Sequence, residues 1–186
     1  SNRLRLTDYL KTHPHVTRHP IKRPVFILGF PRTGTTLLQN LLALDSKRRA
    51  LPFWEIMNPV PVHNDPVKDK KARIRAANAK LRIAYWVLPE MAAVHEIRAE
   101  TLEECWPLLA NGFTVMAWDM GSGWRSYGEW LLKHDMTKAY AEYKQCLQVM
   151  AQRQPHSDFV LKCPDHLWFV DSLIKNFPDA AIVWTH

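Results

Sequence analysis

Residues 24–38, PVFILGFPRTGTTLL, contain the most informative pattern in the chain. The apolar run Pro24–Gly29 is bounded by proline and glycine, which is typical of a strand buried on both faces of a parallel sheet. A loop follows, and leucines then recur at helical spacing, so we expect a helix from about Thr35 to Leu44. Those leucines are Leu37, Leu38, Leu41 and Leu42. The stretch therefore predicts a strand, a loop and a helix in succession.

The loop has the features of a phosphate-binding turn. Gly34 permits a tight turn, backbone amides gather in the concavity, and the helix N-terminus favours an anion. The spacing matches the G-x-x-x-x-G-K-[ST] phosphate loop, except that Thr35 stands at the lysine position. We expect Arg32 to supply the positive charge instead. Hydroxyl donors come from Thr33, Thr35 and Thr36. The plainer alternative is an ordinary glycine turn between a strand and a helix.

Further patterns extend this unit into an α/β domain. Helices are predicted over residues 4–11, 68–88, 135–154 and 166–176, and strands over 158–162 and 180–185. Capping-box spacing at Thr101–Glu104 predicts the start of a short helix, which Pro107 should kink or shorten. Residues 112–128 are predicted to be a loop. Strands alternating with helices predict a parallel sheet with helices on both faces, a three-layer α/β fold.

Composition and charge indicate one globular domain with a basic N-terminal segment. The chain has 186 residues, 47% of them hydrophobic, and a formal net charge of +7. Disordered and collagen-like classes are excluded, and an anionic partner is favoured. We expect residues 1–23 to form a basic arm and residues 24–186 an α/β domain that is incomplete at its C-terminus, because the chain stops on an apolar run. Three scattered cysteines and the lack of a long apolar segment predict a cytoplasmic protein without a transmembrane span.

Four segments of the chain carry a resemblance to a known family. They are residues 24–38, 51–55, 160–167 and 177–186, and they occur in the family's order. Together they resemble the sulfotransferases that use 3′-phosphoadenosine 5′-phosphosulfate (PAPS), in their bacterial-type branch. The resemblance implies a P-loop-type fold, PAPS as co-substrate, no metal, and a small-molecule, glycan or lipid acceptor. It also implies that recognition of the 3′-phosphate lies beyond His186. The residues expected to bind PAPS are Pro31, Arg32, Thr33, Gly34, Thr35, Thr36 and Leu37.

Sulfuryl transfer needs cations for the charge on the transferring group and a base for the acceptor's proton. Arg32 is one expected cation. Lys162, at the end of a predicted strand, is the other, because similar sulfotransferases place a lysine there; its structural alternative is a surface lysine.

Three candidates compete for the role of base. Glu55 is preferred, because several sulfotransferase branches carry a catalytic glutamate shortly after the loop helix, although it could instead be a salt-bridge partner. His95 is the second candidate, since imidazole titrates near neutrality. Glu103 or Glu104 is the third, with helix capping as the structural alternative for Glu104.

Weaker signals complete the functional reading. No set of His, Cys and Asp residues has zinc-site spacing in the sequence, and His166 could be a helix-start residue or a ligand. An apolar strand over residues 113–119 ending in a metal-binding aspartate is a minor alternative. We hypothesise that an acceptor pocket is lined by Trp118, Trp124 and Trp130.

Three other functions stay open. A P-loop kinase or nucleotide hydrolase would use the same loop with Mg²⁺ and ATP. A nucleic-acid-binding module would use the basic face of the helix over residues 68–88, although such faces are usually solvated helix surfaces. That face contains Lys70, Lys71, Arg73, Arg75, Lys80 and Arg82, opposite Ile74, Leu81 and Tyr85. The last alternative is an inactive fragment that keeps the fold.

Overall fold

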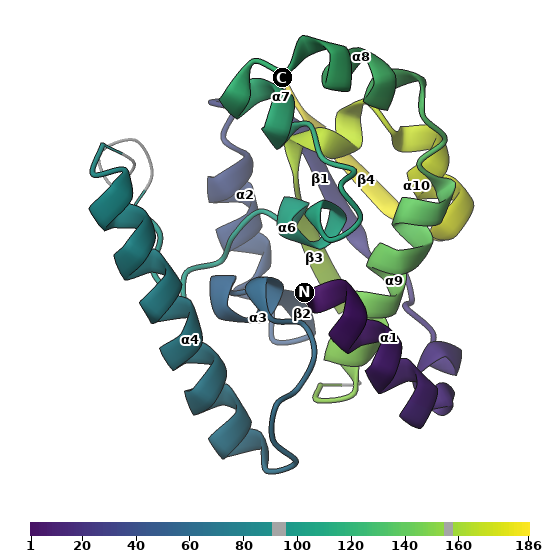
Figure 1. Ribbon diagram of the computed structural model, residues 1–186. Coiled ribbons are helices and arrows are strands. Elements are labelled where there is room, and N and C mark those ends of the chain that lie inside the picture. The colour runs from purple at the N-terminus through teal and green to yellow at the C-terminus, as the bar shows by residue number, and fades with distance from the viewer. Residues whose placement is uncertain (91–95, 155–157) are drawn as a thin grey trace.

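A parallel sheet of four strands lies at the centre of the fold (Figure 1). The computed structural model describes residues 1–90, 96–154 and 158–186. Its strands are β1 (Val25–Gly29), β2 (Arg48–Ala50), β3 (Asp158–Lys162) and β4 (Ala181–Thr185), in the order β2-β3-β1-β4. Ile27 pairs with Lys162 and Gly29 with Thr185, so the carboxyl ends of β1, β3 and β4 meet at one edge. Ligands of open α/β sheets bind at this edge.

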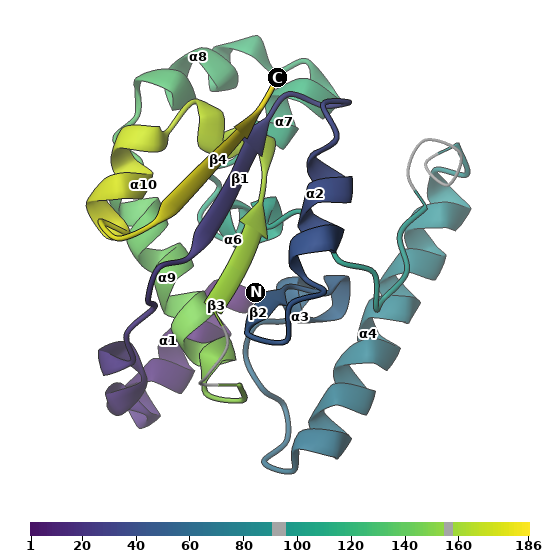
Figure 2. The ribbon, with the colours of Figure 1, turned by 180° about the vertical axis from the view of Figure 1, so that it is seen from behind.

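Helices cover the two faces of the sheet unequally. In Figure 1, α6, α8, α9 and α10 lie in front of the sheet; the reverse view in Figure 2 brings α2 to the near side. α4 stands at the side of the molecule and packs on α3. In the first half of the chain, the helices are α1 (Asn2–Thr12), the 3-10 helix η1 (Pro14–Arg18), α2 (Thr35–Leu42), α3 (Phe53–Met57) and α4 (Pro66–Val87). The others are α6 (Trp106–Ala110), α7 (Ala117–Ser122), α8 (Arg125–Lys133), α9 (Thr137–Ala151), the 3-10 helix η2 (Pro164–Leu167) and α10 (Val170–Asn176). The predicted three-layer α/β fold is confirmed.

The central strands explain where the core lies. All five residues of β1 are buried, as the apolar run predicts. Alternate residues point to opposite faces, so Phe26 belongs to the large cluster that includes Tyr140 and Tyr143 of α9. Ile27 belongs to the smaller cluster under α2. The helix predicted over residues 135–154 is confirmed as α9, which buries Tyr140, Tyr143 and Leu147.

α2 forms where predicted, but its leucines do not all enter the core. Leu38 and Leu42 pack against the sheet, whereas Leu37 and Leu41 are 66% and 54% exposed. A helix turns about 100° per residue, so a face that directs Leu38 to the sheet turns Leu37 away from it. The predicted helix is confirmed and its predicted apolar face is only half correct.

The predicted loop over residues 112–128 is wrong, because α7 and the start of α8 occupy it. Gly123 ends α7 with φ 68°, a left-handed conformation that favours glycine. Gly128 lies so close to Asp119 that an added Cβ would be 2.7 Å from the carboxylate. These glycines therefore serve a helix end and a close helix contact. The alternative of a strand over residues 113–119 is also wrong.

Three other local predictions need correction. Thr101 does not open a helix: its hydroxyl donates to the carbonyl oxygen of Arg98, and α6 begins at Trp106 with Pro107 in its first turn. The helix predicted over residues 166–176 is divided into η2 and α10. The short strand β2 was not predicted, because three residues with two arginines carry little strand signal.

The N-terminal segment is attached to the main core. Leu6, Val16 and Ile21 are buried in the large apolar cluster. The side-chain amide of Gln148 in α9 donates to the carbonyl oxygens of Thr17 and His19. The boundary at residue 23 stays a prediction. Among the described residues, no helix is both long and apolar enough to cross a membrane.

Candidate active site

The loop between β1 and α2 is a tight turn with left-handed residues. Arg32 has φ 74° and Gly34 has φ 83°. A left-handed arginine is uncommon, and such conformations concentrate at functional sites. Gly29 must lack a side chain, because an added Cβ would lie 2.8 Å from Oγ1 of Thr33. The first amides of α2 have no partner within the helix, so the turn presents free donors to an anion.

Lys162, the last residue of β3, reaches the start of α2. Its Nζ donates to Oε1 of Glu104 at 2.9 Å and to Oγ1 of Thr36 at 3.3 Å. The lysine side chain is only 3% exposed, whereas that of Glu104 is 30% exposed. A buried ammonium group is thus held beside the loop by a carboxylate that solvent and ligands can reach.

A cavity of about 580 Å³ opens between these groups. Its lining comes from the loop, the end of β3 and the segment before α6: Pro31, Arg32, Gly34, Thr35, Thr36, Ile97, Glu103, Glu104, Trp106 and Lys162. A second cavity, of about 310 Å³, shares Pro31, Glu104 and Trp106 with it and extends toward α7. Two adjoining compartments therefore meet at Glu104.

The structure brings most of the predicted site residues together. Those that line the larger cavity are Pro31, Arg32, Gly34, Thr35, Thr36 and Lys162. Thr33 turns away instead. Its hydroxyl donates to the carbonyl oxygen of Phe30 and shares a 2.8 Å hydrogen bond with the hydroxyl of Thr185. Leu37 is exposed and does not line the cavity. His95 lies outside the described residues.

Glu55 lies elsewhere. It accepts a 2.5 Å hydrogen bond from Arg49, and both side chains are less than 10% exposed. This pair borders another cavity, of about 400 Å³, together with Arg73 and Asp69. The structure therefore does not place Glu55 on the loop cavity.

Arg73 corrects the predicted basic face of α4. Its side chain is buried, donates to Asp69 at 3.0 Å and stacks over the ring of Trp54. Burial of Asp69 acts to raise its pKa, but hydrogen bonds from the Val62 amide, Arg73 and the His63 amide outweigh burial and lower the pKa of Asp69. One predicted surface arginine is therefore part of a buried ion pair.

Sequence reasoning underrated two residues of the site. Glu104 was a minor candidate, and Trp106 was not among the candidate site residues, although both line the two adjoining cavities. Neither cavity is lined by Trp118, Trp124 or Trp130. Trp118 stacks on Phe113 and Trp130 on His134, and the hypothesis that the three tryptophans line an acceptor pocket stays a prediction.

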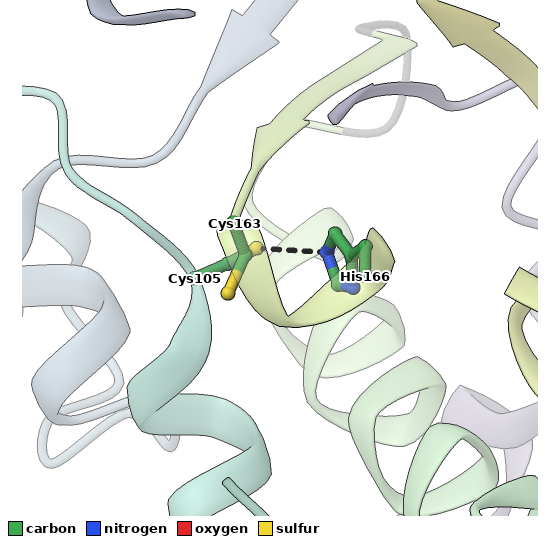
Figure 3. A group of neighbouring side chains, drawn as sticks. All are labelled: Cys105, Cys163 and His166. Atoms are coloured by element: carbon green, nitrogen blue, oxygen red, sulfur yellow. Dashed lines mark hydrogen bonds between the residues drawn. The ribbon is translucent and has the colours of Figure 1, made fainter. Parts of the chain in front are cut away.

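Behind Glu104 and Lys162, the fold gathers a group that the sequence interpretation dismissed. Cys105, Cys163 and His166 are buried, and their ligand-type atoms lie within 4.8 Å of one another (Figure 3). Burial, together with the hydrogen bond to Cys105, raises the pKa of Cys163 well above its usual value. The remaining cysteine, Cys146, is separate, and burial raises its pKa to about 12. The Cys163-x-x-His166 spacing was the one available signal; Cys105 joins it only through the fold.

Comparison with known proteins identifies the family. The sequence model of the sulfotransferase family matches residues 24–186. The chain belongs to the sulfotransferase family. Two solved sulfotransferases are similar along almost the whole chain. STF1 from Mycobacterium tuberculosis H37Rv is 31% identical, with a TM-score of 0.84 over 97% of this chain and 50% of that one. STF9 from Mycobacterium avium is 32% identical, with a TM-score of 0.82 over 99% of this chain and 47% of that one.

A further relative matches a shorter stretch. An uncharacterised protein of Aquifex aeolicus (strain VF5) is 47% identical over 47 residues, which are 23% of this chain and 6% of that protein. This sulfotransferase chain thus spans about half the length of the solved relatives or less. The similarity supports the bacterial-type branch that the four sequence segments indicated.

Proposed function

We propose that this sulfotransferase chain binds PAPS through the loop after β1 and transfers its sulfuryl group to a hydroxyl or amine. The observation that carries the proposal is the position of Lys162, whose ammonium group touches both the first turn of α2 and Glu104. A cation at this point can stabilise the negative charge that develops on the departing phosphate as the sulfuryl group is transferred. Arg32 at the mouth of the loop supplies a second positive charge.

The loop would hold the 5′-phosphosulfate. The free amides at the start of α2 and the hydroxyls of Thr35 and Thr36 provide donors. Gly34 lets the backbone approach the anion closely. Thr35 leaves the usual lysine position of a phosphate loop without a cation, and Lys162 delivers its charge from the neighbouring strand instead.

We propose Glu104, rather than Glu55 or His95, as the general base. Its carboxylate is partly exposed where the two cavities meet, so an acceptor in the smaller cavity could reach it. Glu104 takes the proton of the acceptor as the acceptor oxygen or nitrogen bonds to sulfur and the bond from sulfur to the phosphate oxygen breaks. Lys162 can then shift its hydrogen bond from Glu104 toward the phosphate.

The smaller cavity favours an acceptor with an apolar body. Its lining combines Trp106, Ala117, Met120 and Pro164 with the carboxylates of Glu104 and Asp165. Apolar walls with few polar groups orient a small molecule and leave one reactive atom near the charged end. We therefore propose a small molecule that presents its hydroxyl or amine toward Glu104.

Binding of the desulfated product, 3′-phosphoadenosine 5′-phosphate (PAP), tests the proposal. Isothermal titration of this chain should show PAP binding that Mg²⁺ does not require, and Arg32→Ala should weaken it about tenfold or more, the loss of one hydrogen bond to a charged group. Lys47→Ala, which removes an exposed cation before β2, is the matched control and should bind PAP normally. Tighter binding of Mg²⁺–ATP than of PAP would favour the kinase or hydrolase alternative and contradict the proposal.

A further inference from the structure

Cys105, Cys163 and His166 form a compact group of nitrogen and sulfur atoms that sulfuryl transfer does not use. Cys105 immediately precedes α6, whereas Cys163 and His166 lie on the segment that leads from β3 into η2, so two separate parts of the chain supply the three side chains (Figure 3). All three side chains are buried. Sγ of Cys105 lies 3.3 Å from Nε2 of His166, and the ligand-type atoms of all three lie within 4.8 Å of one another.

From this geometry we propose that Cys105, Cys163 and His166 bind one zinc ion, which fastens the end of β3 to the start of α6. Zinc takes cysteine sulfur at about 2.3 Å and histidine nitrogen at about 2.0–2.1 Å, so neighbouring ligand atoms in a tetrahedral site lie roughly 3.5–3.8 Å apart. The 3.3 Å separation of Cys105 Sγ and His166 Nε2 and the 4.8 Å upper limit for the group bracket these values, so shifts of about 1 Å or less would complete the site. The proposal does not depend on the function of the loop cavity.

The surroundings of His166 orient it as a ligand. Nδ1 shares a 2.8 Å hydrogen bond with the hydroxyl of Tyr140, which leaves Nε2 to face Cys105. Metal-binding histidines are usually fixed through their second ring nitrogen in this way. Tyr140 itself is fully buried in the large apolar cluster and is thus a rigid support.

The fourth position has a candidate group. The buried hydroxyl of Tyr143 has no hydrogen-bond partner of good geometry among the described residues, and the Cys105 thiol is its neighbour. A buried hydroxyl without a partner costs free energy. Coordination to the ion would satisfy it, so the site offers three strong ligands and one weak oxygen.

Charge balance also suits this location. Zinc binding releases the protons of the two thiols, and one Zn²⁺ with two thiolates and a neutral imidazole has no net charge. A neutral cluster can be buried at much lower cost than a lone ion. Cys105 and Cys163 directly follow Glu104 and Lys162, so the ion would also fix the spacing of that ion pair.

Zinc content tests the proposal directly. This chain is purified under reducing conditions, incubated with ZnCl₂, dialysed against metal-free buffer and analysed by inductively coupled plasma mass spectrometry. We expect close to one equivalent of zinc per chain. Cys105→Ser and Cys163→Ser should each lose it, whereas Cys146→Ser, the buried cysteine outside the cluster, should retain it. Tyr140→Phe should weaken zinc binding about 10- to 100-fold through the freed Nδ1.

Cobalt substitution covers the case in which a cysteine variant fails to fold. Co²⁺ added to the unmutated chain should produce a thiolate-to-cobalt charge-transfer band, which a site without cysteine ligands cannot give. Wild-type chain that retains no zinc, equal loss of zinc in Cys146→Ser, or absence of the cobalt band would overturn the proposal. The proposal would also be overturned if mass spectrometry under non-reducing conditions showed that a Cys105–Cys163 disulfide forms in place of zinc binding.

Discussion

Two of the ion pairs in which a glutamate meets a basic residue differ in what can reach them. Lys162 and Glu104 meet at 2.9 Å on the wall of the loop cavity, and the carboxylate is 30% exposed. Arg49 and Glu55 meet at 2.5 Å, and the carboxylate is 4% exposed. We call the first the cavity pair and the second the covered pair, because Arg49 and Glu55 border their own cavity only with side chains that are almost fully buried.

The same type of ion pair serves two purposes in this fold. The covered pair has its donors committed, since Arg49 also donates to the carbonyl oxygen of Met150. It ties β2 to α3 and α9. The cavity pair has a carboxylate that can exchange its lysine for another partner. A charge pair can take part in a reaction only if one member is free to move its hydrogen bond, which the cavity pair alone of these two allows.

The largest effect should come from Glu104→Gln. If Glu104 is the base, sulfuryl transfer from PAPS to an apolar phenol such as 2-naphthol should fall about 10²- to 10⁴-fold. Glu55→Gln, assayed on its folded fraction, should keep transfer within a few-fold of wild type. Equal losses in the two variants would remove the distinction between the pairs.

The loss of stability should be larger in Glu55→Gln than in Glu104→Gln, the reverse of the order expected for sulfuryl transfer. Glu55→Gln leaves Arg49 buried without a counter-charge, so it should lower the free energy of unfolding by about 3–5 kcal/mol. Glu104→Gln also removes the counter-charge of a buried ammonium, but Thr36 still accepts from Lys162 and position 104 is open to solvent, so the loss should be smaller, about 1–3 kcal/mol. Urea unfolding followed by circular dichroism measures both. A greater loss of stability in Glu104→Gln than in Glu55→Gln would contradict this part of the account.

The region around the covered pair should also determine how strongly the stability of the fold depends on acid pH. The pKa of Asp69 is lowered in the folded chain, so its contribution to stability is present above the unfolded pKa near 3.8 and is lost as pH falls through the folded value. Asp69→Asn should therefore be less stable at neutral pH and lose less stability on acidification. Urea midpoints between about pH 6 and pH 2 check this; a wild-type acid dependence retained in Asp69→Asn would count against it.

The smallest predicted effect concerns the loop itself. Thr33 bonds to Phe30 and Thr185 rather than to the cavity, so Thr33→Val should lower the free energy of unfolding by about 1 kcal/mol. PAP affinity should change much less than in Arg32→Ala. Thermal denaturation and titration on the same samples separate the two effects, and a large loss of PAP affinity with unchanged stability would assign Thr33 to the ligand.

The sequence predicted those parts of the fold and site that depend on neighbouring residues. β1, the loop and the start of α2 follow one another, so an apolar run and two glycines were enough. Lys162 was found because it ends a predicted strand, where ligands of α/β folds bind, and because similar sulfotransferases place a lysine there. Glu104 was underrated, because its place depends on the Cys105 amide donating to the carbonyl oxygen of Lys162, 57 residues away.

The same limitation explains the other errors. Arg73 belongs to a basic run, and only the packing of α4 on α3 buries it against Trp54. The glycines over residues 112–128 resembled loop residues, although Gly123 ends one helix and Gly128 permits contact between two. In each case, long-range packing decided a position that local propensity left open.

In the proposed reaction, Lys162 binds the phosphosulfate while Glu104 acts on the acceptor. PAP titration into wild type, Lys162→Met and Glu104→Gln, side by side by calorimetry, tests it most directly. We expect Lys162→Met to weaken PAP binding about ten- to a hundredfold, because one charged hydrogen bond is lost. We expect Glu104→Gln to bind PAP at least as tightly as wild type, because it removes a negative charge beside an anion. Unchanged PAP affinity in Lys162→Met, or an equal loss in both variants, would contradict it.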